Sequence, residues 1–200
     1  MRTTATRLAQ AALCIVPTLT PWTPLGDQMT LGSASRLWVA GTSTVRSFEC
    51  KATAFDAAIA TSGPGAARLV AGGQKAVTTV TVTVPAERLD CANGTMNEHM
   101  LKALKSSEHP TITFALSSYD IATEGEAVKG TLRGQLTLGG VTKPITIPAT
   151  GTAAGDGSLR VTGSHALNMK DYGLKPPSLM MGTMKVKEIV TVHFDLILKG

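Results

Sequence analysis

Apolar and polar residues alternate along most of the chain, with the period of two that is typical of strands burying one face. The clearest stretches are residues 79–84, 111–116, 128–138 and 190–198. On one face of the last stretch lie Val190, Val192, Phe194, Leu196 and Leu198. No pattern of crossover helices separates these stretches, so the sequence predicts an antiparallel sheet with one buried and one solvated face.

About eight such strands follow one another, and glycines stand inside several of them. This combination favours an all-β antiparallel barrel over a sandwich, and eight strands enclose room for one small ligand. Gly139-Gly140 predicts a tight hairpin. The alternation slips by one residue within 45–59, which predicts a β-bulge, and the glycine-rich residues 61–73 predict a loop.

One short amphipathic helix is expected within residues 89–110. Thr95 or Asn97 is the expected N-cap, and Glu98 fits a capping box with Thr95. The apolar stripe of this helix consists of Met96, Met100, Leu101 and Leu104. The stripe has to be buried against the sheet. Two interpretations stay open: the helix plugs one end of the barrel, or its methionines line an apolar ligand site.

Residues 1–34 have the pattern of a secretory leader. Two arginines precede an apolar stretch at residues 8–19, which is too short to span a bilayer. We expect cleavage between Gly26 and Arg36, leaving residues 35–200 as one barrel domain that is periplasmic or secreted. No later segment is apolar enough to span a membrane, so we expect at most transient membrane contact.

Removal of the leader would leave two cysteines, Cys50 and Cys91. In an oxidising compartment an even pair of cysteines predicts a disulfide. The alternative is a pair of buried free thiols.

Composition and spacing argue against several function classes. The formal net charge is +5 with scattered basic residues, and aromatic residues make up 4% of the chain, so stacking platforms for nucleic acid are missing. The histidines lack the close spacing of metal ligands, and neither a nucleophile elbow nor a phosphate loop is present. We therefore expect no catalytic residues, no metal, no cofactor and no nucleic-acid partner.

Two histidines need individual interpretation. Glu98 and His99 are adjacent on the expected helix and do not face each other, so a solvated surface pair is favoured over an acid/base pair. His165 falls by strict alternation on the apolar face between Val161 and Leu167. It is either a core histidine satisfied by hydrogen bonds, or a polar contact for a ligand head group inside the barrel.

A second unusual stretch is residues 168–184, which is longer than a hairpin needs. It contains Met169, Tyr172, Met180, Met181 and Met184. Outside the expected leader, every methionine lies either here or in the expected helix. Methionine suits adaptable apolar surfaces, so the two segments would together line one opening of the barrel, or would merely cap its core.

Four segments, taken in order, resemble a known family. They are GTSTVRSFEC, LDCANGTMNEHMLKALKSSEHPTITF, GQLTLGGVTKPITI and NMKDYGLKPPSLMMGTMKVKEIVTVHFDL. Over nearly all of residues 35–199 the chain resembles the YceI-like family of lipocalin-shaped polyisoprenoid-binding proteins. The resemblance implies an extended, lipocalin-like antiparallel barrel that binds a long isoprenoid chain, often in an exported protein. It also implies a link to isoprenoid quinones and to stress responses.

The sequence thus predicts binding, transport or storage of a long-chain isoprenoid or similar amphiphilic lipid inside the barrel. The expected ligand-binding residues are Phe48, Met96, Met100, Leu104, Phe114, Leu132, Leu136, Val161, His165, Met169, Tyr172, Met180, Met181 and Phe194. One alternative is a barrel enzyme, an isomerase or hydrolase with an acid/base pair in the cavity. Another is a structural or stress-related interaction protein whose barrel is filled by its own side chains.

Overall fold

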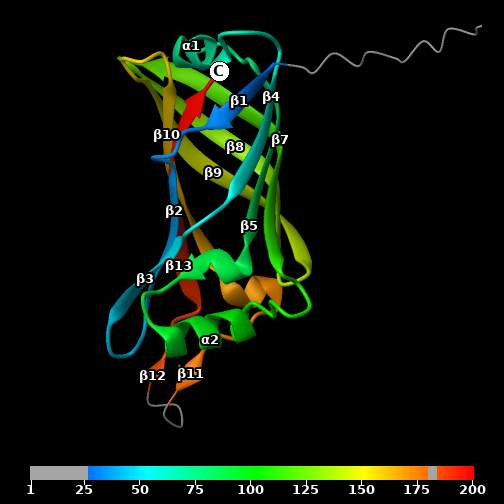
Figure 1. Cartoon of the computed structure of the whole chain (residues 1–200), viewed down its shortest axis with the longest axis vertical. Helices are drawn as coiled ribbons and strands as arrows, with labels where there is room; N and C mark the ends of the chain where they lie inside the picture. Colours follow the sequence, from blue (N-terminus) through cyan, green and yellow to red (C-terminus); the bar gives the residue numbers. More distant parts are fainter. Residues whose placement is uncertain (1–26, 180–183) are drawn as a thin grey trace, which may run out of the picture.

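The computed structural model describes residues 27–179 and 184–200, and within them eight antiparallel strands close into a barrel (Figure 1). Around the ring these strands are β1 (Gln28–Leu31), β4 (Asp56–Thr61), β5 (Val77–Pro85), β7 (Thr111–Glu124), β8 (Ala127–Leu138), β9 (Val141–Ala153), β10 (Leu159–Asn168) and β13 (Ile189–Lys199). The short strand β1 completes the ring because it pairs with β4 on one side and with β13 on the other. The predicted all-β barrel of about eight strands is confirmed.

Three further strands lengthen the wall of the barrel. They are β2 (Arg36–Thr42), β3 (Ser47–Ala52) and β6 (Leu89–Asp90), and they follow β13 in the order β13-β2-β3-β6. Strand β13 pairs with β1 through Leu198 and Lys199, and with β2 through residues 191–195. The same edge of β13 therefore pairs with β2 along one part of its length and with β1 along another. The strands that follow β2 extend the wall beyond the closed ring.

Two helices lie at opposite ends of the barrel, α1 (Ala66–Ala71) and α2 (Gly94–Ala103) (Figure 1). Helix α1 falls in residues 61–73, so the prediction of a loop there is wrong. Six residues are too few to form a stable helix alone. Burial of Ala66, Ala67 and Val70 against the sheet supplies the stabilisation, which a sequence pattern does not reveal.

The start of α2 also differs from the prediction. Its N-cap is Asn93, whose Oδ1 accepts a hydrogen bond from Met96 N at 2.9 Å, so neither Thr95 nor Asn97 caps the helix. Asn97 has another function: its Oδ1 accepts from Cys91 N at 2.8 Å, and its Nδ2 donates to Asp90 Oδ1 at 2.9 Å. The helix begins earlier because asparagine at the cap satisfies a backbone donor of the first turn.

The predicted bulge within residues 45–59 is wrong as well. The slip in alternation marks the boundary between two strands, because β3 pairs with β2 and β6 whereas β4 pairs with β1 and β5. The chain leaves one part of the wall and enters another between Ala52 and Asp56. The Gly139-Gly140 hairpin is confirmed, with φ values of 55° and 81° that suit glycine at both positions.

Strand β1 lies inside the stretch of residues 1–34 that the sequence assigns to a leader. Its Met29 is only 2% exposed and packs with Ile59, Leu159 and Leu198. The barrel therefore begins before residue 35, and the expected boundary is too late by at least the length of β1. The leader itself and its cleavage stay predictions.

Short elements complete the end that carries α2. They are the 3₁₀ turns η1 (Ala86–Arg88) and η2 (Met169–Tyr172) and the small hairpin of β11 (Ser178–Leu179) and β12 (Met184–Lys185). Within residues 27–179 and 184–200, no helix has the length and hydropathy needed to cross a bilayer.

In the part of the chain that the structure describes, buried apolar side chains form two separate clusters rather than one core. The first surrounds α1 and contains Met29, Ile59, Ala66, Ala67, Val70, Ala76, Leu159 and Leu198. The second lies toward α2 and contains Leu138, Leu167, Met169, Tyr172, Leu174 and Val190. Other buried side chains, among them Val84, Val128 and Ile147, belong to neither cluster and stand on β5, β8 and β9.

Candidate functional site

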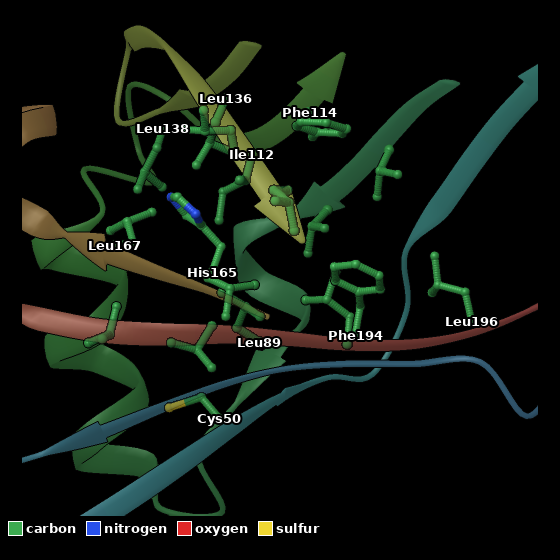
Figure 2. Close-up of a pocket in the computed structure, with 18 of the residues that line it drawn as sticks. Cys50, Leu89, Ile112, Phe114, Leu136, Leu138, His165, Leu167, Phe194 and Leu196 are labelled. Atoms are coloured by element: carbon green, nitrogen blue, oxygen red, sulfur yellow. The ribbon is translucent and has the colours of Figure 1, made fainter. Parts of the chain in front are cut away.

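A cavity of about 570 Å³ occupies the barrel between the two clusters (Figure 2). Its volume falls within the roughly 300–1,000 Å³ that is usual for small-molecule sites. Inward-facing residues of the long strands supply most of its wall, and these are overwhelmingly valine, leucine, isoleucine and phenylalanine. Such a wall offers burial of apolar surface and little hydrogen bonding.

The structure places most of the predicted ligand-binding residues on this wall. They are Phe48, Met96, Met100, Leu104, Phe114, Leu132, Leu136, Val161, His165, Met169 and Phe194. Alternation identified those on strands, because the side-chain period of a strand fixes which residues face inward. Met96, Met100 and Leu104 reach the cavity from α2 and the residue that follows it, whereas Leu101, the fourth member of the predicted stripe, is not among the lining residues.

Three predicted residues are not placed on the wall. Tyr172 belongs to the second cluster, where it is 3% exposed and packs beside Leu138 and Leu174 instead of lining the cavity. Burial, followed by the neighbouring Asp171 carboxylate, raises the pKa of its hydroxyl. The prediction failed because a loop has no period from which to infer direction. Met180 and Met181 lie outside the described residues.

The cavity reaches the protein surface at the α2 end. Among its described lining residues the exposed ones are Arg46, Asn93 and Thr95, from the β2–β3 turn and the start of α2. At the α1 end the lining residues Ile59, Leu159 and Leu198 are buried. The cavity is therefore a blind tunnel with a polar rim, completed by Ser43 and His99.

Sequence reasoning missed this rim. His99 was expected to be solvated beside Glu98, yet it is half-buried and lines the cavity, whereas Glu98 is exposed. Arg46 stands in a turn that has no apolar period. Periodicity shows which side chains face inward but not which end of a barrel is open, so the signal for the rim was absent.

His165 is a polar side chain within the apolar part of the tunnel. Figure 2 shows its imidazole directed into the cavity, on the side where Ile112, Leu136, Leu138 and Leu167 also lie. Its partner across β10 and β13 is Val192, and Leu167 follows it on the same face. Tyr119 also lines the tunnel, but its hydroxyl accepts a hydrogen bond from Val77 N at 3.1 Å.

A disulfide between Cys50 and Cys91 anchors the rim, which confirms the predicted pairing. It joins β3 to the segment that leads into α2. Cys91 Sγ lies 3.6 Å from Met100 Sδ, so the bridge contacts the apolar stripe of the helix. The covalent link holds α2 across the end of the barrel.

On the outer face, Asp195 is 6% exposed and lies beneath two arginines. Arg160 donates to both of its oxygens, at 2.8 and 2.7 Å, and Arg36 donates to Oδ2 at 2.8 Å. The Arg160 hydrogen bonds outweigh burial and, with Arg36, lower the pKa of the Asp195 carboxyl to about 2.

Among residues 27–179 and 184–200, no group of three or more His, Cys, Asp or Glu side chains is arranged to hold a metal ion.

Comparison with known proteins gives one match by family. Residues 32–198 match the model of the YceI-like domain. The UPF0312 protein PA0423 of Pseudomonas aeruginosa is 36% identical over 103 residues, which are 48% of this chain and 52% of that protein. The UPF0312 protein PSPA7_0523 of Pseudomonas paraeruginosa is 34% identical over 103 residues, again 48% of this chain and 52% of that protein. The chain thus spans about half the length of the curated relatives it matches.

Solved structures share the architecture at low sequence identity. A polyisoprenoid binding domain from Saccharophagus degradans, implicated in plant cell wall breakdown, superposes with a TM-score of 0.64 at 13% identity, covering 86% of this chain and 98% of that one. BcnA of Burkholderia cenocepacia gives a TM-score of 0.62 at 18% identity, covering 82% and 95%. At such identities the likeness is one of fold.

Proposed function

The chain belongs to the YceI-like domain family, and from this premise we propose that its barrel binds a long-chain isoprenoid or a similar amphiphilic lipid. The observation that carries the proposal is the blind, apolar tunnel of about 570 Å³. Each CH₂ group that leaves water for such a wall contributes about 0.8 kcal/mol. The Saccharophagus degradans domain of the same fold, described as polyisoprenoid binding, supports this class of ligand.

Binding suits the described residues of the site better than catalysis. Two histidines line the tunnel, His99 on the rim and His165 inside. No carboxylate is among the described lining residues. General acid/base chemistry needs a group positioned within hydrogen-bond reach of the reacting proton, usually with a partner that tunes it. A tunnel of this volume also favours ligand binding over a barrel filled by its own side chains.

We further propose that the protein works in an oxidising compartment, periplasmic or secreted. The Cys50–Cys91 disulfide supports this, because such bonds persist outside the reducing cytosol. The basic and apolar start of the chain supports export with cleavage. Cleavage would then fall before β1, since removal of Met29 would open the first apolar cluster.

Native mass spectrometry of the protein purified from its own host tests the ligand. The expected result is a mass above that of the polypeptide, with an isoprenoid released by organic extraction. Leu136 faces the tunnel and Gln135 faces solvent on the same strand, so Leu136→Trp and Gln135→Trp form a matched pair. Leu136→Trp should lose the lipid and Gln135→Trp should retain it. Equal lipid in both variants, or none in the wild type, would contradict the proposal.

A further inference from the structure

His165 is a hydrogen-bonding side chain without a partner. Its imidazole makes no hydrogen bond with any residue in the described parts of the chain, and its surroundings on the wall are Leu167, Val192 and other apolar side chains. A neutral imidazole has one donor and one acceptor. Leaving such a group unpaired away from water costs roughly 1–3 kcal/mol.

This cost depends on what fills the tunnel. Water can pair with the imidazole while the tunnel is empty of lipid. A purely hydrocarbon chain would displace that water and leave the imidazole unpaired, which weakens its binding. A ligand that brings its own oxygen to the same place avoids the penalty.

The charge distribution restricts the kind of oxygen. Among the described lining residues the only permanently charged side chain is Arg46, on the exposed rim. A phosphate beside His165 would be buried with no permanently charged side chain next to it to balance its charge, which is unfavourable. An uncharged hydroxyl or carbonyl group meets the imidazole without that cost.

The tunnel beyond His165 has room for an apolar tail. His165 pairs with Val192, and the tunnel wall continues along β13 to Leu198 at the closed end. Six residues of strand correspond to about 20 Å along the strand direction. The wall over this length is apolar, apart from Tyr119 and its engaged hydroxyl.

We propose that His165 forms a hydrogen bond with an uncharged hydroxyl or carbonyl group of the bound lipid. The polar end of the ligand then lies inside the barrel on the α2 side, while the tail extends toward α1. The inference rests on the proposed function and adds to it the chemistry and the orientation of the ligand. His165 is accordingly a specificity-determining residue for lipids with a neutral polar end.

The test compares geranylgeraniol with the hydrocarbon of the same skeleton that lacks the hydroxyl, by isothermal titration calorimetry. The wild type should bind the alcohol about tenfold more tightly than the hydrocarbon, as expected for one hydrogen bond made or lost in an apolar site. His165→Leu should bind both equally, and His165→Gln should restore part of the preference. Val192→Leu, which changes the wall beside His165 without a polar atom, should affect both ligands alike.

A second measurement does not depend on any variant. The imidazole ¹⁵N resonances of His165 in the wild-type protein should shift on addition of the alcohol and should not shift in the same way with the hydrocarbon. If His165→Leu retains the preference, or if the resonances respond alike to both ligands, the inference is wrong while lipid binding stands. Tight binding of geranylgeranyl diphosphate that depends on Arg46 and not on His165 would also overturn it. Failure of the wild type to bind any of these probes would instead refute the proposed function.

Discussion

The ring of Phe48 occupies the space in front of Gly41, its partner across β2 and β3: a Cβ atom at position 41 would lie 2.4 Å from Phe48 Cζ. The ring of Phe194 lies in the same way against its partner Gly163, whereas the ring of Phe114 lies against Gly134, a diagonal neighbour on β8. A glycine beside each of these inward phenylalanines lets the ring rest on the wall instead of projecting into the tunnel. These pairs therefore determine how wide the tunnel is.

Gly41→Ala should narrow the tunnel. The three atoms nearest to the added methyl group all belong to the Phe48 ring, so the ring has to turn toward the cavity. We expect weaker lipid binding and a loss of about 1 kcal/mol in the free energy of unfolding from overpacking. Lipid content by extraction and unfolding in urea are the measurements. Gly155→Ala is the control, because a Cβ atom there meets nothing within 4 Å. The same lipid content in both variants would show that the Gly41 position does not set the width.

Met100→Asp should reduce lipid binding without unfolding the barrel. Met100 lines the tunnel from α2, and a carboxylate placed there is either desolvated or forced to take up a proton. Lys102→Asp puts the same side chain on the exposed face of α2 and should bind lipid as the wild type does. Lipid occupancy by mass spectrometry distinguishes them. Equal occupancy would remove α2 from the site.

Asp195 should make stability depend on acid pH. Its folded-state pKa of about 2 lies below the ordinary value, so the ionised carboxylate favours the folded state. The contribution is complete above about pH 4 and is lost as pH falls toward 2. This contribution to the free energy of unfolding is on the order of 1–2 kcal/mol. It is no larger because both arginines are at least half-exposed and water screens their charges. Asp195→Asn should flatten the urea-unfolding profile over this range, and an unchanged slope would contradict the assignment.

The disulfide should stabilise the fold substantially. Cys50 and Cys91 are 41 residues apart, and closing a loop of that length is worth up to about 4 kcal/mol in the chain-entropy model. Cys50→Ser combined with Cys91→Ser should lower the free energy of unfolding by up to this amount. Wild-type protein unfolded in the presence of a reductant should behave like the double variant. Identical urea midpoints for oxidised wild type and double variant would refute the expectation.

Strand β1 should be needed for a stable barrel. A chain that starts at Ser35 lacks β1, so β4 and β13 lose their shared neighbour and Ile59 loses its contact with Met29. Open strand edges promote aggregation. A chain that starts at Asp27 should stay monodisperse in size-exclusion chromatography, whereas the shorter one should aggregate or unfold. Protein isolated from the host should accordingly begin at or before Gln28.

Alternation predicted the barrel well because a strand in a closed sheet has one inward and one outward face along its whole length. Phe114, Leu136 and His165 were all placed correctly by that rule alone. The period of a helix was informative in the same way: Met96 and Met100 are four residues apart, so they share one face of α2, and both line the tunnel.

Features set by contacts between distant segments were not predictable in this way. Helix α1 exists because Ala66, Ala67 and Val70 meet side chains of other elements, which no local pattern records. Tyr172 was misplaced because the direction of a side chain in an irregular segment depends on its neighbours in space. The rim at Arg46 and His99 depends on which end of the barrel stays open, and both ends have equally good alternation.

Closure of the ring by β1 and β13 has a consequence for how the chain reaches this structure. Thr30 bonds to Lys199 across a sequence separation of 169 residues, and only two register pairs join the strands. Such non-local pairing raises the contact order and slows folding. During synthesis the ring stays open until β13 has left the ribosome. Until then β1 lacks its second neighbour and the apolar inner face of the sheet is open, so this is the stage at which the chain is most exposed to aggregation.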